Sequence, residues 1–409
     1  MSKLQELIDR LCPNGVDFKP LGEVCEFQRG DTLSSKDAIE GDVPVMAGGQ
    51  KPSCYHNVAN RSGETIVVAG SGAYAGFVTY WNIPVFVSDA FTVNPSNCML
   101  PKYVFYFLKN NQEKIHATKK GAGVPHVHGK DIAKFLIPVP PIEVQEEIVK
   151  ILDRFADYAA ELQAELQAEL QARRLQYEYY RNLLLTFNPS AYGCGTDDAQ
   201  KISVIARGGH SYEIQWKTMG EIASFKYGFT AKGCDKGDAW YIRITDISEL
   251  GSLLPYDKKY IILNDESVEY LLNKDDIVMA RTGATFGKTL LYEEDIPAVY
   301  ASFLIKISFK NNDVLNKYYW HFTKSKHYWK QANKFVSKGG QPQFNANSLS
   351  QIVIPIPPLE LQEKIVAILD RFETLVNDLS KGLPAEIEAV KARYEYYRNK
   401  LLTFNPLSA

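Results

Sequence analysis

The chain has 409 residues, of which 45% are hydrophobic and 23% are charged, and its formal net charge is -2. This composition excludes a disordered chain and a uniformly basic DNA-coating protein, although a near-neutral total is compatible with local basic faces. The length predicts two or three domains.

Two further features of the composition bear on where the protein works. No run of 18 apolar residues occurs, and the first six residues include an acid where a signal peptide is apolar. We therefore expect a cytoplasmic protein without a membrane span. The six cysteines form no Cys-x-x-Cys pair, which favours buried reduced thiols over a zinc site or a disulfide framework.

The first half of the chain predicts a helix, a β-rich domain and a long helical segment. Residues 1–16 form the expected N-terminal helix, and 17–140 form a β-rich domain with strands at 65–69 and 84–87 and a helix at 102–118. The following segment, 141–187, lacks Pro and Gly from 143 to 185 and carries apolar residues at helical spacing. This pattern predicts one helix of about 43 residues.

The second half predicts the same order of elements. Residues 188–212, rich in Gly, are expected to link the halves, and 213–357 form a second β-rich domain with a strand at 303–307 and a helix at 314–335. The last segment, 358–409, is again helical, but Gly382 and Pro384 predict a break near 381–384.

The chain contains an internal repeat. Residues 137–155 return at 354–372 with fourteen of nineteen positions identical, and Tyr-Glu-Tyr-Tyr-Arg-Asn at 177–182 returns at 394–399. Weaker similarities extend upstream, so each copy has a diverged globular part and a near-identical helical part. We predict an α+β fold in which two β-rich domains are separated by a pair of long antiparallel helical regions with an internal pseudo-two-fold repeat.

The helical parts are expected to pair with each other and to bind the same partner twice. A coiled coil that serves only to dimerise the protein is the alternative interpretation. Ala-Glu-Leu-Gln occurs three times in a row from residue 160 to 171, so the first helix carries a regular apolar stripe. The candidate residues of these partner and spacer helices are Leu162, Leu166, Leu170, Tyr179, Tyr180, Leu379, Leu383, Ile387, Tyr396 and Tyr397.

Motifs for chemistry are weak in this sequence. Residues 282–289 resemble a phosphate-binding P-loop, but Thr282 stands where the first glycine is required, so a Gly-rich turn between strands is favoured. Such a turn could still bring backbone N–H groups near a DNA phosphate. His126 and His128 lack further ligands at metal spacing. We expect no catalytic residue, metal or cofactor in this chain.

Basic stretches at matching places in the two copies indicate DNA contact. No acidic residue occurs from 314 to 359, where six lysines alternate with aromatic and amide side chains, and a similar stretch lies at 114–130. Lysines bind phosphates, and Arg, Asn and Gln can read base edges, although a solvated lysine-rich face is the simpler alternative. The candidates are Arg29, Lys119, Lys120, His128, Lys130, Arg243, Arg281, Lys288, Lys338, Gln343 and Asn345. Arg29 and Arg243 fit equally well as ordinary surface or ion-paired residues.

Two repeated motifs resemble a known family. Ile-Pro-x-Pro-Pro-x-Glu-x-Gln-x-x-Ile at 137–148 and 354–365, with Tyr-Glu-Tyr-Tyr-Arg at 177–181 and 394–398, resembles the specificity subunit, HsdS, of type I restriction-modification systems. The resemblance implies that two target-recognition domains each read half of an asymmetric split site on double-stranded DNA. It also implies helices that bind two modification subunits, which methylate adenine, and further restriction subunits. Methyl donor, Mg²⁺ and ATP are then expected only on those partners.

The short tandem repeat suggests a hypothesis about the spacer between the half-sites. One four-residue unit adds about 6 Å of helix, and one base pair adds about 3.4 Å of DNA. The number of units would then set the length of the unread spacer. Two rival functions remain at this point: an enzyme acting alone on DNA or nucleotide, and a structural coiled-coil adaptor with only non-specific DNA affinity.

Overall fold

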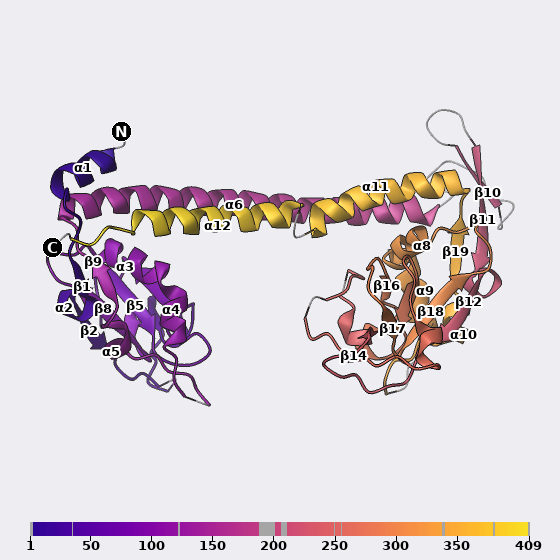
Figure 1. Cartoon of the computed structure of the whole chain (residues 1–409), viewed down its shortest axis with the longest axis horizontal. Helices are drawn as coiled ribbons and strands as arrows, with labels where there is room; N and C mark the ends of the chain where they lie inside the picture. Colours follow the sequence, from indigo (N-terminus) through magenta and orange to yellow (C-terminus); the bar gives the residue numbers. More distant parts are fainter. Residues whose placement is uncertain are drawn as a thin grey trace. The chain divides into compact units, whose positions relative to one another are not determined.

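The computed structural model divides into two compact units. It describes residues 3–34, 36–121, 123–187, 201–205 (backbone only), 211–248, 250–254, 256–337, 340–378 and 381–407. Unit 1 comprises Met1–Gln167 and Glu386–Ala409, and unit 2 comprises Ala168–Ala385. Each unit therefore contains one β-rich domain and parts of both helical regions (Figure 1). The expected helical segments 141–187 and 358–409 do not form domains of their own.

The two helical regions differ in continuity. Helix α6 runs unbroken over 45 residues, Ile142–Thr186, which confirms the single long helix predicted from the absence of Pro and Gly. The second region consists of α11 (Leu359–Asn377) and α12 (Leu383–Leu401). Because α11 ends at Asn377 and α12 begins at Leu383, the break overlaps the one expected near 381–384 but begins earlier. Pro384 lies in the first turn of α12, where its missing N–H is tolerated.

Unit 1 is built on a four-stranded sheet, a three-stranded sheet and a strand pair. The sheet orders are β2-β8-β5-β6, β4-β3-β7 and β1-β9, and only β3 and β7 pair in parallel among these strands. The elements are α1 (Lys3–Leu11), β1 (Phe18–Pro20), α2 (Leu21–Val24), β2 (Cys25–Arg29), β3 (Val43–Met46), β4 (Cys54–His56), β5 (Thr65–Ala69), β6 (Val78–Trp81), β7 (Phe86–Val87), β8 (Ala90–Pro95), α3 (Pro101–Asn110), α4 (Gln112–Ala117), α5 (Gly129–Ile132) and β9 (Leu136–Pro138). The helix expected at 102–118 is two helices interrupted at Asn111.

Unit 2 repeats this topology, except that its third sheet has three strands where unit 1 has a pair. Its sheets have the orders β12-β18-β15-β16, β14-β13-β17 and β10-β11-β19, and β13 pairs in parallel with β17. The elements are β10 (Lys201–Ile205), β11 (Ser211–Thr218), α7 (Met219–Ile222), β12 (Ala223–Tyr227), β13 (Ala239–Ile242), η2 (Ile244–Asp246), β14 (Tyr260–Ile261), η3 (Ser267–Tyr270), β15 (Ile277–Ala280), η4 (Gly283–Thr285), β16 (Thr289–Leu291), β17 (Ala298–Tyr300), β18 (Leu304–Phe309), α8 (Asn316–Thr323), α9 (Lys326–Phe335), α10 (Ala346–Ser350) and β19 (Val353–Ile356).

Two expectations for unit 2 need correction. The helix expected at 314–335 is two helices: α8 ends at Thr323, and Ser325 caps α9 by accepting a hydrogen bond from the Tyr328 N–H. The expected linker 188–212 contains strand β10 and the first residues of β11, which pair with each other. Residues 188–200 and 206–210 lie outside the described part of the chain.

The core of each β-rich domain extends onto the helix that follows it. In unit 1, Val144, Ile148 and Leu152 of α6 are fully buried in the cluster that contains β5 and α3. In unit 2, Ile365 and Leu369 of α11 occupy the matching places. Burying such side chains contributes about 1.5–3 kcal/mol each, so every domain is fixed rigidly to its own helix.

A buried glutamine makes the same three hydrogen bonds in both copies. Gln145 accepts from the Leu100 N–H at 2.9 Å and donates to the carbonyl oxygens of Cys98 and Pro140 at 2.9 and 2.8 Å. Gln362 repeats these contacts with Leu315, Asp313 and Pro357 at 2.9, 2.7 and 2.8 Å. The glutamine of the Pro-Pro-x-Glu-x-Gln motif therefore joins each helix start to its domain.

Each helical region contacts the helical region of the other copy in both units. Phe155 of the first copy lies 5.6 Å from Tyr397 of the second in unit 1, measured between ring centroids. Phe372 of the second copy lies 5.7 Å from Tyr180 of the first in unit 2. Such reciprocal contacts are those of a self-complementary pairing. They confirm the predicted antiparallel helices and internal repeat, which Figure 1 shows as α6 beside α12 and α11.

The predicted spacer residues occupy different environments on these helices. Leu162, Leu166, Leu170 and Ile387 are half-buried, and Leu383 is buried. Tyr179 and Tyr396 are exposed at equivalent positions, at 63% and 61%. Leu379 lies outside the described residues.

One repeated contact differs between the copies. The Tyr106 hydroxyl donates to Asp153 at 2.6 Å in unit 1, whereas His321 Nε2 lies 2.8 Å from Asp370 in unit 2. His321 is fully buried, and this burial lowers its pKa although Asp370 acts in the opposite direction. The histidine is therefore harder to protonate in the folded protein than in the unfolded chain.

This shift predicts that unit 2 loses stability in mild acid. The unfolded state binds the proton first as pH falls below about 6.5, so the stabilisation is complete above that pH and declines toward the folded pKa. Burial also lowers the pKa of His327, so this residue changes the stability in the same direction. We expect a lower urea midpoint at pH 5.5 than at pH 7.5 by Trp fluorescence. His321→Tyr, which introduces the residue of unit 1, should reduce the difference between the urea midpoints at the two pH values. If that difference is unchanged in the variant, His321 is not the source of the pH dependence.

Candidate nucleic-acid interface

In each domain a loop bonds in the same way to the end of an inner strand of the four-stranded sheet. In unit 1, the Val127 N–H donates to the Gly70 carbonyl at 2.9 Å, just after β5. In unit 2, the Phe344 N–H donates to the Arg281 carbonyl at 2.8 Å, just after β15. The residues flanking these contacts, together with the end of β2 or β12, form what we call the recognition corner of each domain.

The corner of unit 1 surrounds a hollow of about 400 Å³. Arg29, His126, His128 and Lys130 line it together with aromatic and backbone groups, and these four side chains are exposed. The two histidine rings lie parallel, with their centroids 6.4 Å apart. The acidic side chain in the lining, Asp89, accepts a hydrogen bond from the Ser71 hydroxyl. Donors therefore dominate this corner, as contact with phosphates or base acceptors requires.

Two other candidates of unit 1 lie in the same loop, but each of their ammonium groups already has a partner within the domain. The Lys119 ammonium donates to the Ala73 carbonyl at 3.0 Å. Lys120 forms an ion pair with Asp131 at 2.7 Å, and this hydrogen bond lowers the pKa of that carboxyl. Because the Lys120 side chain is 61% exposed, this pair is weakly held and a phosphate could replace the carboxylate.

The corner of unit 2 holds an arginine between two aromatic rings. Arg281 donates from Nε to the Ser302 carbonyl at 3.1 Å, and its guanidinium lies 5.3 Å from the Tyr227 ring centroid and 5.4 Å from that of Phe303. Gln343 is exposed beside it, since Thr282 and Gln343 form a β-bridge. Cation–π attraction to the two rings and the hydrogen bond to Ser302 help to hold the guanidinium in place, which suits it to reading a base edge.

Asn345 has a structural role at this corner. Its side chain accepts from the Ser348 N–H at 3.0 Å and so caps α10. The hydroxyl of Tyr227, which was not among the sequence candidates, accepts from the Ala346 N–H at 3.2 Å. Lys338 lies outside the described residues.

Two sequence candidates lie away from the corner. Arg243 forms ion pairs with buried Asp246 at 2.6 Å and with Asp257 at 3.2 Å, and the hydrogen bond to Asp246 raises its pKa. Arg243 therefore matches the ion-paired alternative rather than a DNA contact. Lys288 lines a separate hollow with Arg181 and Lys324 instead of joining Arg281.

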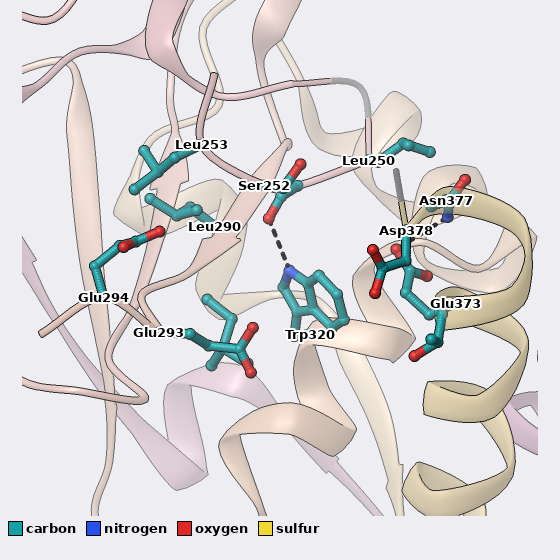
Figure 2. Close-up of a pocket in the computed structure, with 13 residues that line it drawn as sticks. Leu250, Ser252, Leu253, Leu290, Glu293, Glu294, Trp320, Glu373, Asn377 and Asp378 are labelled. Atoms are coloured by element: carbon teal, nitrogen blue, oxygen red, sulfur yellow. Dashed lines mark hydrogen bonds between the residues drawn. The ribbon is translucent and has the colours of Figure 1, made fainter. Parts of the chain in front are cut away.

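A further hollow of unit 2 is acidic and unsuited to DNA. It has a volume of about 360 Å³, and Glu293, Glu294, Glu373 and Asp378 lie around Trp320 (Figure 2). The Trp320 indole N–H donates to the Gly251 carbonyl at 3.3 Å. Carboxylates gathered in this way repel phosphates, so this hollow is not a DNA contact.

The P-loop-like segment is a turn between two strands. Residues 282–288 connect the antiparallel strands β15 and β16, and Gly283 and Gly287 adopt φ values of +69° and +77°, which favour glycine. A P-loop instead leads from a strand into a helix. The favoured interpretation as a Gly-rich turn is therefore confirmed.

The described residues contain neither a metal-binding cluster nor a helix fit to cross a membrane. No group of three or more His, Cys, Asp or Glu side chains in these ranges is placed to hold a metal ion. None of the helices described combines the length and the apolar character that crossing a membrane requires.

Comparisons with known proteins agree on one family. The profile described as "Type I restriction modification DNA specificity domain" matches residues 13–172 and 213–389, one match for each copy of the repeat. The putative type I restriction enzyme specificity subunit S.HindORF215P of Haemophilus influenzae is 32% identical over 410 residues, covering 95% of this chain and 96% of that protein. The EcoR124I/EcoR124II specificity subunit of Escherichia coli is 27% identical over 449 residues, covering 99% and 97%.

A solved structure shows the same fold. That solved chain is described as "Structural basis underlying complex assembly and conformational transition of the type I R-M system". It matches with a TM-score of 0.63 at 18% identity, and the match covers 95% of this chain and 98% of that one.

Proposed function

This chain belongs to the family of type I restriction-modification DNA specificity proteins, and from that premise we propose that it selects the DNA target of such a complex. The observation that carries the proposal is the pair of recognition corners, which share one backbone geometry but carry different side chains. Two different readers on a repeated framework recognise an asymmetric site in two parts.

The chemistry of the corners supports this division. Arg29, His126, His128 and Lys130 present donors in unit 1, which suit the acceptor atoms of guanine and the DNA phosphates. Unit 2 presents Arg281 and the amide of Gln343, and an amide can pair with both the N7 and the N6 of adenine. Each corner thus reads its own half of a bipartite double-stranded site.

We propose that the repeated helical surfaces bind two copies of the modification subunit. Tyr179 and Tyr396 are exposed at equivalent positions, and equal surfaces bind equal partners. Restriction subunits complete the assembly in the cytoplasm. The chain itself acts without catalysis, and methyl donor, Mg²⁺ and ATP bind to the partner subunits.

A structural adaptor with only non-specific DNA affinity fits less well. Such a protein needs a basic surface. It does not need different hydrogen-bond donors at the equivalent place in the two copies of the repeat. The family's description as a DNA specificity domain also favours the sequence-reading function.

The proposal is tested by mapping adenine methylation across the genome of the source strain with and without this gene. We expect the deletion to remove one asymmetric split motif. Arg29→Ala should relax discrimination in one half of the motif and Arg281→Ala in the other, by about 1–3 kcal/mol each. Arg10→Ala, an exposed arginine of α1, is the control and should change neither half.

Two outcomes contradict the proposal. An unchanged methylome after deletion rejects the specificity function in that strain. Equal relaxation of both halves by each arginine variant rejects the assignment of one corner to one half-site.

A further inference from the structure

The turn between β17 and β18 presents a phenyl ring at the recognition corner of unit 2. The Leu304 N–H donates to the Ala301 carbonyl at 2.8 Å, which closes a tight turn over 301–304. Phe303 lies in this turn, and its side chain is 51% exposed. The guanidinium of Arg281 lies 5.4 Å from the centroid of the Phe303 ring. An accessible apolar ring is therefore in contact with the arginine that we assign to base reading.

The backbone of this turn is held by two neighbouring strands. The Gly228 N–H, just after β12, donates to the Leu304 carbonyl, and the Arg281 N–H donates to the Phe303 carbonyl, both at 3.0 Å. A Cβ atom at Gly228 would lie 2.2 Å from the Ala301 carbonyl oxygen, so only glycine lets the end of β12 approach the turn this closely. The fold therefore fixes the place from which the ring projects.

The first copy carries a carboxylate at the same backbone position. The Gly70 N–H donates to the Asp89 carbonyl at 3.1 Å, which repeats the hydrogen bond from Arg281 to Phe303. The strand residues next to these positions pair in the same register in both units. The Asp89 carboxylate accepts a hydrogen bond from the Ser71 hydroxyl, whereas the ring of Phe303 has no polar atom. The two copies thus place different chemistry on one backbone, as residues that read different bases do.

An exposed apolar side chain alone does not indicate a contact, because single ones are common on protein surfaces. Ile296 of the same unit is 44% exposed, for example, and it follows Glu294 and Asp295 in a loop whose acidic character is unfavourable near DNA. Phe303 differs because its ring lies against a cation at a corner where donors face outward. Its surroundings match those of a base contact.

We propose that Phe303 reads the methyl group of a thymine in the half-site of unit 2, close to a guanine read by Arg281. This inference rests on the proposed function and adds a base to it. In the major groove the C5 methyl group is the apolar mark of thymine, and a phenyl ring makes favourable contact with it, whereas arginine pairs with the O6 and N7 of guanine. Because ring and guanidinium lie 5.4 Å apart, the two bases lie within about two base-pair steps of each other.

Replacing thymine by uracil in the DNA tests this contact, because the exchange removes the methyl group and leaves the base pairing unchanged. Synthetic duplexes carry the mapped motif with deoxyuridine in place of one thymine at a time, and the chain is purified with its modification subunits. The half-site of unit 2 is the half that Arg281→Ala relaxes. We expect one position in it at which uracil weakens binding by about fourfold, the effect of one methyl group, and no effect in the unread spacer.

Variants of the chain assign this effect to the ring. Phe303→Ala should bind the thymine duplex about fourfold more weakly and should no longer distinguish thymine from uracil at that position. Phe303→Leu keeps an apolar side chain and should retain most of the difference. Ile296→Ala is the matched control, since it truncates an exposed apolar side chain elsewhere in unit 2, and it should behave as the unaltered chain does.

The outcomes separate this inference from the proposed function. Specific binding of the target that no uracil in the half-site of unit 2 weakens overturns the role of Phe303 and leaves the proposed function intact. A uracil effect that persists in Phe303→Ala does the same, because another group then contacts the methyl. Equal binding of the target and a scrambled duplex contradicts the proposed function and this inference together.

Discussion

Deleting one four-residue unit, Ala164–Gln167, from α6 should abolish methylation at the original target and create methylation at one with a shorter spacer. The deletion shortens the helix that joins the two units by about 6 Å, which is close to the length of two base pairs. Both recognition corners are untouched, so the two half-site sequences should remain. This is the largest effect expected, because a misplaced half-site cannot be read at all.

Adenine methylation mapped with the modification subunits present measures this change. Glu165→Gln is the matched control, since it alters the charge of the unit and leaves the helix length unchanged. A deletion variant that still methylates the original motif with its original spacer shows that the unit number does not set the spacer.

Gln362→Leu should destabilise unit 2 by about 3 kcal/mol or more. The substitution leaves the Leu315 N–H and the carbonyl oxygens of Asp313 and Pro357 buried without their partner, and each such group costs about 1–3 kcal/mol. Urea unfolding followed by Trp fluorescence reports on this unit, because four of the five tryptophans, all except Trp81, belong to it.

An exposed glutamine in the same kind of helix provides the control. Gln171→Leu on α6 should change the free energy of unfolding by less than about 0.5 kcal/mol. A Gln362→Leu protein as stable as Gln171→Leu would show that water or neighbouring groups replace the lost hydrogen bonds.

The sequence predicted the helical framework better than its interruptions. The length of α6 follows from local helix propensity and from the absence of Pro and Gly, so it could be predicted without tertiary information. The breaks at Asn111 and Ser325 depend on capping and on packing against the sheet, which single-residue patterns do not contain. Strand pairing joins residues far apart in the chain, so only the strongest strands, such as 65–69, could be predicted.

The recognition corners were predicted only in part. His128 and Lys130 in the first copy, and Gln343 in the second, belong to a continuous polar stretch of sequence, so charge and composition indicated them. Tyr227 was missed, because its place at the corner comes from the end of a distant strand. Arg243 forms ion pairs with Asp246 and Asp257, which was one of the interpretations that the sequence left open.

The buried glutamines bear on how new target sequences arise. The three hydrogen bonds that Gln145 and Gln362 share all go to backbone groups, so these contacts between helix and domain depend on the backbone of the domain. A domain that keeps this backbone and the apolar core packed against its helix can change its exposed surface without any adjustment of the helices. The fold thereby separates assembly from recognition, which lets selection alter the target while the rest of the complex is inherited intact.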